Sequence, residues 1–196
     1  MQITNKQFII FVGRSGSGKG TQSKLLSDYF TQESTKNDLI ITGDIFRAMM
    51  QLDNPTSVIA KSIYDKGGRH PDFLALSLIG KYFFERYDAS STYIVDGAAR
   101  SYYEAVNLID IARYYSFDRI KVVYINVSYE WSIDKLKLRG RNDDNEHNFL
   151  IKKHWFENEV LAAIEYFREN QYVDFVEIDG EKPINDIHAE IIAKIK

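Results

Sequence analysis

A glycine-rich segment with one lysine, residues 13–22 (GRSGSGKGTQ), carries the clearest chemical signal in the sequence. It follows an apolar run at residues 8–12 and precedes a helical pattern at 22–30. Glycines lack a Cβ, so the backbone can curl and aim its N–H groups inward, and a helix N-terminus adds partial positive charge. Lys19 adds a full charge and three donors. The segment therefore predicts a cradle for the phosphates of a nucleotide.

This segment fits the P-loop pattern up to the lysine and then departs from it. The pattern requires Ser or Thr directly after the lysine, but Gly20 stands there and the hydroxyl follows one place later, at Thr21. At this point the sequence leaves open whether a hydroxyl of the loop binds magnesium directly. The alternative is a glycine-rich turn that binds nothing, which the order of strand, glycines, lysine and helix disfavours.

Three further segments place arginine and aspartate where a phosphate site would need them: residues 42–47 (TGDIFR), 96–100 (DGAAR) and 139–144 (RGRNDD). Guanidinium groups are planar forks that match phosphate oxygens, and an aspartate after a strand beside a P-loop is where magnesium is usually supported. Taken singly, each segment is also consistent with a surface arginine, a capping aspartate or a charge-compensated turn. Together they favour phosphoryl transfer, which proteins catalyse mainly by positioning and charge neutralisation.

The elements that position these segments follow from the spacing of apolar residues. Short apolar runs at 8–12, 39–41, 93–95, 120–125 and 175–178 predict strands buried on both faces. The stretches between most of them have helical spacing, so the chain predicts an α/β fold with a parallel sheet and helices on both faces. Between 41 and 93 the alternation breaks, and patterns at 42–52, 56–66 and 71–86 predict a helical insertion at the ligand-binding edge.

Length and composition exclude several classes of protein. A chain of 196 residues is most simply one domain. Cysteine is absent, which excludes disulfides and cysteine-ligated zinc, and we expect no zinc. The net charge of −3 argues against nucleic-acid binding. No apolar stretch approaches the roughly 20 residues of a membrane span, and no signal-peptide pattern is present, so we expect no membrane association and a cytoplasmic protein.

Taken together, the ordered motifs resemble the adenylate kinase family of nucleoside monophosphate kinases. The resemblance runs through residues 13–22, 42–47, Lys66-Gly67 with Pro71, 96–100 and 139–144. It implies a P-loop NTPase three-layer fold, with a five-stranded parallel sheet and helices on both faces. One kinase domain would span residues 1–196, with a helical segment for the nucleoside monophosphate (NMP) at about 42–72 and a minimal lid at about 139–145. We expect a monomer.

The resemblance also implies roles for individual residues. The ATP-binding residues would be Gly16, Ser17, Gly18, Lys19, Gly20, Thr21, Lys135 and Gly180. The NMP-binding residues would be Thr42, Arg47, Gly67, Gly97, Arg100 and Glu104. The catalytic residues would be Lys19, Arg100, Arg139, Arg141 and Lys152, the last standing where the family usually carries arginine. Mg²⁺ would be supported, through water, by Asp96 with Asp143 or Asp144.

Two departures from the family concern the lid and the third motif. A single glycine separates Arg139 from Arg141, where relatives insert several residues or a small domain. Because a lid excludes water, we expect more hydrolysis of ATP without acceptor than in a long-lid relative. Ala98-Ala99 replaces the usual Phe-Pro before Arg100, which should loosen the position of that arginine.

A third departure bears on the acceptor base. Glu104 stands where relatives that accept AMP usually have glutamine, and an ionised carboxylate cannot donate to adenine N1. Thr42 matches the adenine-type relatives, so the two residues disagree, and AMP is weakly favoured. The predicted function is transfer of the γ-phosphoryl of ATP to a nucleoside monophosphate. The alternatives are a UMP/CMP kinase or other NMP-specific kinase, a P-loop kinase with another small acceptor, and a nucleotide-binding assembly factor with weak ATPase activity.

Overall fold

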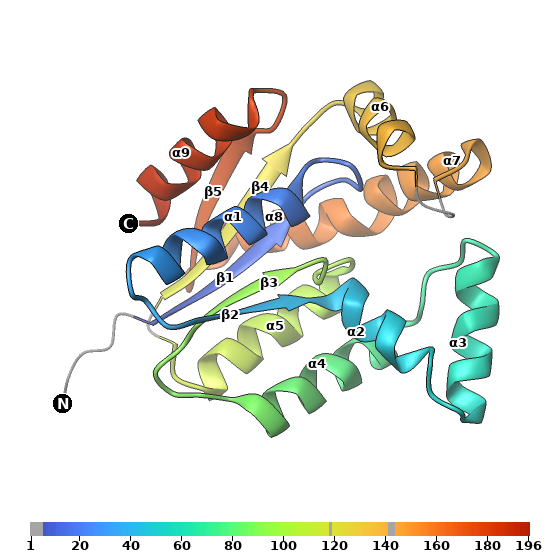
Figure 1. Cartoon of the computed structure of the whole chain (residues 1–196), viewed down its shortest axis with the longest axis horizontal. Helices are drawn as coiled ribbons and strands as arrows, with labels where there is room; N and C mark the ends of the chain where they lie inside the picture. The colour runs from blue at the N-terminus through green and yellow to red at the C-terminus, as the bar shows by residue number, and fades with distance from the viewer. Residues whose placement is uncertain (1–5, 118, 141–143) are drawn as a thin grey trace.

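The computed structural model of the chain describes residues 6–117, 119–140 and 144–196. Within these residues, five parallel strands form one sheet in the order β2-β3-β1-β4-β5 (Figure 1). The strands are β1 Gln7–Val12, β2 Asn37–Ile41, β3 Thr92–Asp96, β4 Arg119–Asn126 and β5 Val173–Asp179. The helices are α1 Lys19–Gln32, α2 Thr42–Met49, α3 Pro55–Asp65, α4 Asp72–Arg86, α5 Tyr102–Tyr114, α6 Tyr129–Arg139, α7 Glu146–Trp155, α8 Leu161–Glu169 and α9 Ile184–Ile195, with a short π-helix, η1, at Phe156–Val160. The predicted fold class and all five predicted strands are confirmed.

The sheet lies between two layers of helices (Figure 1). Every residue of β1 is buried, and successive side chains point to opposite faces. Phe8, Ile10 and Val12 join the core beneath α4, α5 and α8, whereas Ile9 and Phe11 join the core beneath α1 and α9. Burial on both faces explains why the strands read as continuous apolar runs.

The strand register brings the carboxyl ends of the central strands together. Asp96, the last residue of β3, pairs in register with Phe11 of β1 and Ile41 of β2. The P-loop leaves the end of β1, so Asp96 lies at the base of the loop. This edge is where open parallel sheets bind ligands.

The predicted helical insertion is present as α2, α3 and α4, which lie at the carboxyl edge and beside the sheet (Figure 1). Asn54 caps α3 by accepting a hydrogen bond from Ser57 N at 2.9 Å. The first helix ends at Met49 rather than at residue 52. Asp44 does not cap it: the N-cap residue is Ile41, and Asp44 lies in the first turn.

On the other side of the P-loop, α6 and α7 face the insertion across the carboxyl edge (Figure 1). Ser128 caps α6, and Gly140 ends it at φ 61°, where glycine is favoured. Asn145 caps α7, so Asp144 is not its capping residue. The π-helix η1 joins α7 to α8; this geometry was not anticipated. Among the residues described, no helix combines the length and apolar character needed to cross a membrane.

Candidate active site

A cavity of about 1180 Å³ opens at the carboxyl edge of the sheet, between the P-loop, the helical insertion and α6–α7. The predicted site residues that line it are Gly16, Ser17, Gly18, Lys19, Gly20, Thr21, Arg47, Gly67, Asp96, Gly97, Arg100, Lys135, Arg139, Lys152 and Gly180. Thr42, Glu104 and Asp144 are not among the described residues that line it. Arg141 and Asp143 lie outside the described residues.

The P-loop packs so closely that side chains on two of its glycines, Gly13 and Gly16, would collide with neighbouring backbone. Gly13 and Gly16 have φ of 142° and 85°, in the region that favours glycine. A Cβ on Gly13 would lie 2.5 Å from the carbonyl oxygen of Ile125, and one on Gly16 would lie 2.5 Å from that of Ser132. The loop is thereby fixed against β4 and α6 as it enters α1, whose N-terminal N–H groups and dipole favour an anion.

Lys19 reaches back into the loop from the first turn of α1. Its Nζ donates to the carbonyl oxygens of Gly13 at 2.8 Å and Arg14 at 2.6 Å. Burial lowers the pKa of Lys19 to about 8, while Asp96 raises it and Arg100 and Arg139 lower it further. The ammonium group therefore lies in a partly desolvated position where a phosphate would restore its charge.

Asp96 is the carboxylate best placed to support a cation beside the loop. Asp96 is 8% exposed, and a Cβ built on Gly20 would lie 3.3 Å from Asp96 Oδ2. A larger residue at position 20 would thus crowd this carboxylate. Among the described residues, no three His, Cys, Asp or Glu side chains gather as a ready metal site. A magnesium ion near Asp96 would therefore need ligands from phosphates and water.

Two arginines lie along the insertion side of the cavity. Arg47 forms an ion pair with Asp44 within α2, and Arg100 Nε donates to the carbonyl oxygen of Gly97 at 2.8 Å. Both residues line the cavity, and each guanidinium has further N–H donors beyond those bonded to the described residues, which suits phosphate oxygens. Arg100 follows Ala99, whose φ is 58°.

The Ala98-Ala99 turn is a buried part of the core rather than an exposed connector. Ala98 is 4% exposed and Ala99 is 1% exposed. Because a proline ring fixes φ near −65°, the φ of 58° at Ala99 cannot belong to a Phe-Pro turn with the same backbone path. The backbone path observed here therefore excludes an unstrained proline at position 99. Whether Ala98-Ala99 loosens Arg100 stays a prediction.

Thr42 and Glu104, the two expected base-reading residues, are held away from the cavity. Thr42 is 2% exposed, and its hydroxyl makes no hydrogen bond with the described residues. Glu104 is also 2% exposed. Its Oε2 accepts the backbone N–H of Arg100 at 2.7 Å, and its Oε1 pairs with Arg69 at 3.1 Å. Glu104 thus contacts the protein through both oxygens.

Arg139, Lys152 and Asp144 form one ion-pair network at the α6–α7 side. Arg139 donates to Asp144 through Nε at 2.8 Å and through a terminal nitrogen at 2.7 Å, and Lys152 Nζ donates to it at 2.9 Å. Burial raises the pKa of Asp144, but these hydrogen bonds outweigh it and lower the pKa to about 2. The carboxylate expected to support magnesium is therefore engaged by two cations.

Lys135 and Gly180 are the two expected ATP-binding residues outside the P-loop. Lys135 Nζ lies 4.2 Å from the ring centroid of Trp131 on α6, and both residues line the cavity. Gly180 follows β5, and a Cβ there would lie 2.5 Å from Ile125 and 2.7 Å from Val127 side-chain atoms. Glycine at this position thus has a packing reason in addition to the expected approach of a base.

Sequence reasoning missed several residues that shape the cavity. Arg69 and His70 line it, and the His70 ring stacks on Phe46 at 4.7 Å between centroids. Arg14 places its guanidinium 4.0 Å from the ring centroid of Phe156, tying the P-loop to the π-helix. No local signal in the sequence singles out Arg69. Two of its carboxylate partners, Glu104 and Glu159, are distant in sequence and leave no local pattern.

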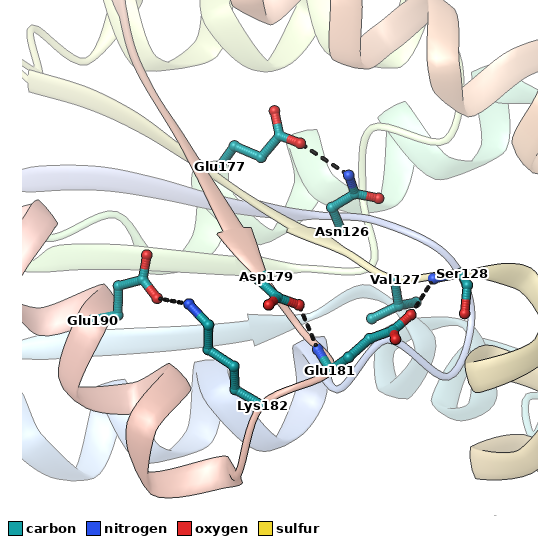
Figure 2. A pocket seen from close by; sticks show the side chains of 8 residues that line it. All are labelled: Asn126, Val127, Ser128, Glu177, Asp179, Glu181, Lys182 and Glu190. Atoms are coloured by element: carbon teal, nitrogen blue, oxygen red, sulfur yellow. Dashed lines mark hydrogen bonds and ion pairs between the residues drawn. The ribbon is translucent and has the colours of Figure 1, made fainter.

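A second hollow, of about 470 Å³, lies beyond the end of β5 (Figure 2). Its lining includes four acidic residues, Glu177, Asp179, Glu181 and Glu190, against Lys182. Figure 2 shows these groups bonded to their neighbours: Glu181 accepts from Ser128 N at 2.7 Å and Lys182 donates to Glu190 at 2.9 Å. An excess of carboxylates repels phosphate, so the nucleotide site is the larger cavity.

Comparisons with known proteins agree with this geometry. A model of the family described as "Adenylate kinase" matches residues 11–172. The chain is 28% identical to adenylate kinase 1 of Nostoc sp. over 95% of its own length and 97% of the relative's. It is 27% identical to the adenylate kinase of Corynebacterium diphtheriae, over 95% and 98%, and 25% identical to that of a Prochlorococcus marinus strain, over 97% and 99%. With a P-loop, an α/β sheet and a cation-lined cavity in place, the chain belongs to the adenylate kinase family.

Proposed function

We propose that this phosphotransferase moves the γ-phosphoryl group of ATP to AMP and forms two molecules of ADP. The observation that carries the proposal is one continuous cavity lined both by Lys19 of the P-loop and by Arg47 and Arg100. Its volume of about 1180 Å³ exceeds the roughly 300–1,000 Å³ of a pocket for one drug-sized ligand. Room and cationic side chains therefore exist for two phosphate-bearing ligands end to end.

The reaction requires no covalent enzyme intermediate. An oxygen of the AMP phosphate attacks the γ-phosphorus of ATP, and the bond from that phosphorus to the β–γ bridging oxygen breaks. Lys19 would hold the outer phosphates of the donor, and Arg47 and Arg100 would hold the acceptor phosphate. Arg139 and Lys152 line the same cavity from α6 and α7, and they would neutralise charge on the transferring group.

Magnesium would be bound by the donor phosphates, where it neutralises charge as the phosphoryl group is transferred. Asp96 is the residue of this chain that we assign to support it, through water, because its carboxylate borders Gly20 at the base of the P-loop. We give Asp144 a different role, which is to orient Arg139 and Lys152. Arg141 and Asp143 keep their expected roles as predictions.

We infer one kinase domain with an NMP-binding segment at about 42–72 and a minimal lid at about 139–145. A short lid covers less of the transferring group, so the expectation of increased ATP hydrolysis without acceptor still holds. The monomeric state and the cytoplasmic location also stay predictions. Size-exclusion chromatography with light scattering tests whether the protein is a monomer.

The central experiment measures ADP formation from ATP and Mg²⁺ with AMP, CMP, UMP, dTMP or GMP as acceptor. We expect AMP to give the highest kcat/KM, with two ADP formed for each ATP consumed. A higher kcat/KM for another monophosphate would overturn the assignment of AMP while leaving the kinase. Nucleotide binding without turnover of any acceptor would instead indicate the assembly factor.

A further inference from the structure

Arg69 lies in the turn between α3 and α4 and is surrounded by carboxylates from three elements. Its guanidinium pairs with Asp72 at the start of α4, with Glu104 in α5 and with Glu159 in η1. The side chain is 15% exposed, and the residue lines the cavity. Among the described residues, its Nη1 donates to Glu159 alone, so one of the two Nη1 hydrogens has no partner in this part of the chain. An arginine so held has fixed geometry and a donor left for a ligand.

Glu104, in contrast, is oriented away from a ligand by its own contacts. One oxygen accepts the backbone N–H of Arg100 at 2.7 Å, and the other accepts from Arg69 at 3.1 Å. Ser101 caps α5 by accepting from Glu104 N at 3.1 Å, so Glu104 belongs to the capping structure at the start of this helix. It therefore links the phosphate-side residue Arg100 to Arg69 without lining the cavity.

Arg100 is near both the P-loop lysine and the Arg69 cluster. Burial lowers the pKa of Lys19, and the charges of Asp96, Arg100 and Arg139 also act on it. The backbone N–H of Arg100 and the guanidinium of Arg69 both donate to Glu104, at 2.7 Å and 3.1 Å. If Arg100 holds the acceptor phosphate, the acceptor nucleoside extends toward Arg69.

Aromatic surface lies at this same end of the cavity. His70, next to Arg69 in the chain, stacks nearly parallel on Phe46, with an angle of 7° between the rings. Both ring nitrogens of His70 are buried without a hydrogen bond to the described residues. A flat apolar surface beside fixed polar groups is what a nucleobase site needs.

We propose that Arg69 is the residue that reads the acceptor base, by donating a hydrogen bond to N1 of adenine. Glu104 is then a positioning residue that holds Arg69 and the Arg100 backbone. The inference rests on the proposed function, since it takes AMP as the acceptor. This assignment resolves a conflict at position 104. N1 of adenine needs a hydrogen-bond donor, which the Glu104 carboxylate lacks and the Arg69 guanidinium supplies.

The test compares AMP with 1-deaza-AMP, in which a C–H group replaces N1, at saturating ATP. Losing a hydrogen bond from a charged donor should lower kcat/KM of the unmodified enzyme about ten- to a hundredfold for the analogue. In Arg69→Met the preference should fall below about threefold, with an unchanged KM for ATP. Arg86→Met is the matched control, because Arg86 is an exposed arginine at the end of α4, and it should keep the full preference.

Arg69→Met leaves carboxylates without their cation and is expected to cost stability. Arg69→Met/Glu159→Gln removes one of these carboxylates together with the cation, and the same loss of preference is expected from it. Melting temperature and ATP affinity confirm that each variant is folded. A folded variant of either kind that retains the full preference for AMP over 1-deaza-AMP overturns the proposal.

The positioning role of Glu104 has its own readout. Glu104→Gln should reduce the preference for AMP over 1-deaza-AMP when Arg69 is present and leave it unchanged in the Arg69→Met background. An equal effect in both backgrounds would show that Glu104 reads the base itself. These outcomes are separate from the proposed function: if AMP is not an acceptor at all, the panel of monophosphates fails first.

Discussion

Replacing Asp144 by asparagine tests whether its carboxylate positions Arg139 and Lys152 by forming ion pairs with both. Its side chain has no exposed area, whereas that of Arg139 is 32% exposed and that of Lys152 is 13% exposed. The asparagine keeps the size of the side chain but leaves Arg139 and Lys152 without an anion between them. We therefore expect both a loss of stability and poorer orientation of the cavity cations.

The size of the effect follows from the pKa. Hydrogen bonds from Arg139 and Lys152 overcome burial and lower the pKa of Asp144 from 3.8 to about 2, which corresponds to about 2.4 kcal/mol. Because Arg139 is partly exposed to solvent, screening reduces this to about 1–2 kcal/mol. For a domain of this size the melting temperature should fall by about 2–8 °C.

The dependence on pH has a defined sign. A carboxylate whose pKa is lower in the folded state contributes stability above its unfolded pKa and loses it as pH falls toward the folded pKa. The difference between the native chain and Asp144→Asn should thus be constant above about pH 5 and shrink toward pH 2. Urea unfolding across this range measures it, with Glu85→Gln in the exposed Lys81 pair as control. Equal stabilities at neutral pH, or a difference that persists undiminished in acid, would refute the reasoning.

Three further changes test the loop, the turn and the insertion. Because burial lowers the pKa of Lys19 to about 8, the Kd for ATP should rise as the pH increases above about 8. Lys19→Met should abolish this pH dependence and reduce kcat at least about a hundredfold. Calorimetric titrations measure the Kd, and turnover assays measure kcat. Ala99→Pro should destabilise the protein by more than about 1 kcal/mol, whereas Ala99→Gly should be neutral or stabilising, and a proline variant as stable as the native chain in urea would contradict the observed φ. Gly67→Ala should raise the KM for the acceptor and lower stability, because Gly67 has φ 69° and a Cβ there would lie 2.1 Å from Asn148 Oδ1. The control is Gly80→Ala in the middle of α4, where a Cβ would have no neighbour within 4 Å. This control should be neutral or stabilising.

The fold could be predicted from the sequence because its main signals are local. Continuous apolar runs identify strands buried on both faces, and the glycine-rich loop fixes where β1 ends and α1 begins. The π-helix η1 could not be predicted in this way, because Phe156 reads as an ordinary apolar position of one long helix. The geometry of η1 depends on packing, including the contact of the Arg14 guanidinium with the Phe156 ring.

The site could be predicted only as a set of residue types. The P-loop, Asp96 and the arginines were identified because they follow predicted strands and helices, and the structure gathers those that it describes around one cavity. Which charged side chains pair with one another has no sequence signature. The sequence predicts roles for Asp144 at magnesium and for Glu104 at the base, but it does not predict that Asp144 pairs with Arg139 and Lys152 or that Glu104 pairs with Arg69.

These pairings share a physical consequence for catalysis. Arg47, Arg69 and Arg139 each hold a carboxylate partner within the protein, so their guanidinium groups are positioned before a nucleotide binds. Ordering a long cationic side chain costs up to about 2 kcal/mol of conformational entropy, and this cost is met in folding rather than in binding. The carboxylates also weaken the long-range attraction of phosphates. The arrangement thus favours accurate placement of two anionic ligands over rapid capture of either, which is what transfer between two nucleotides requires.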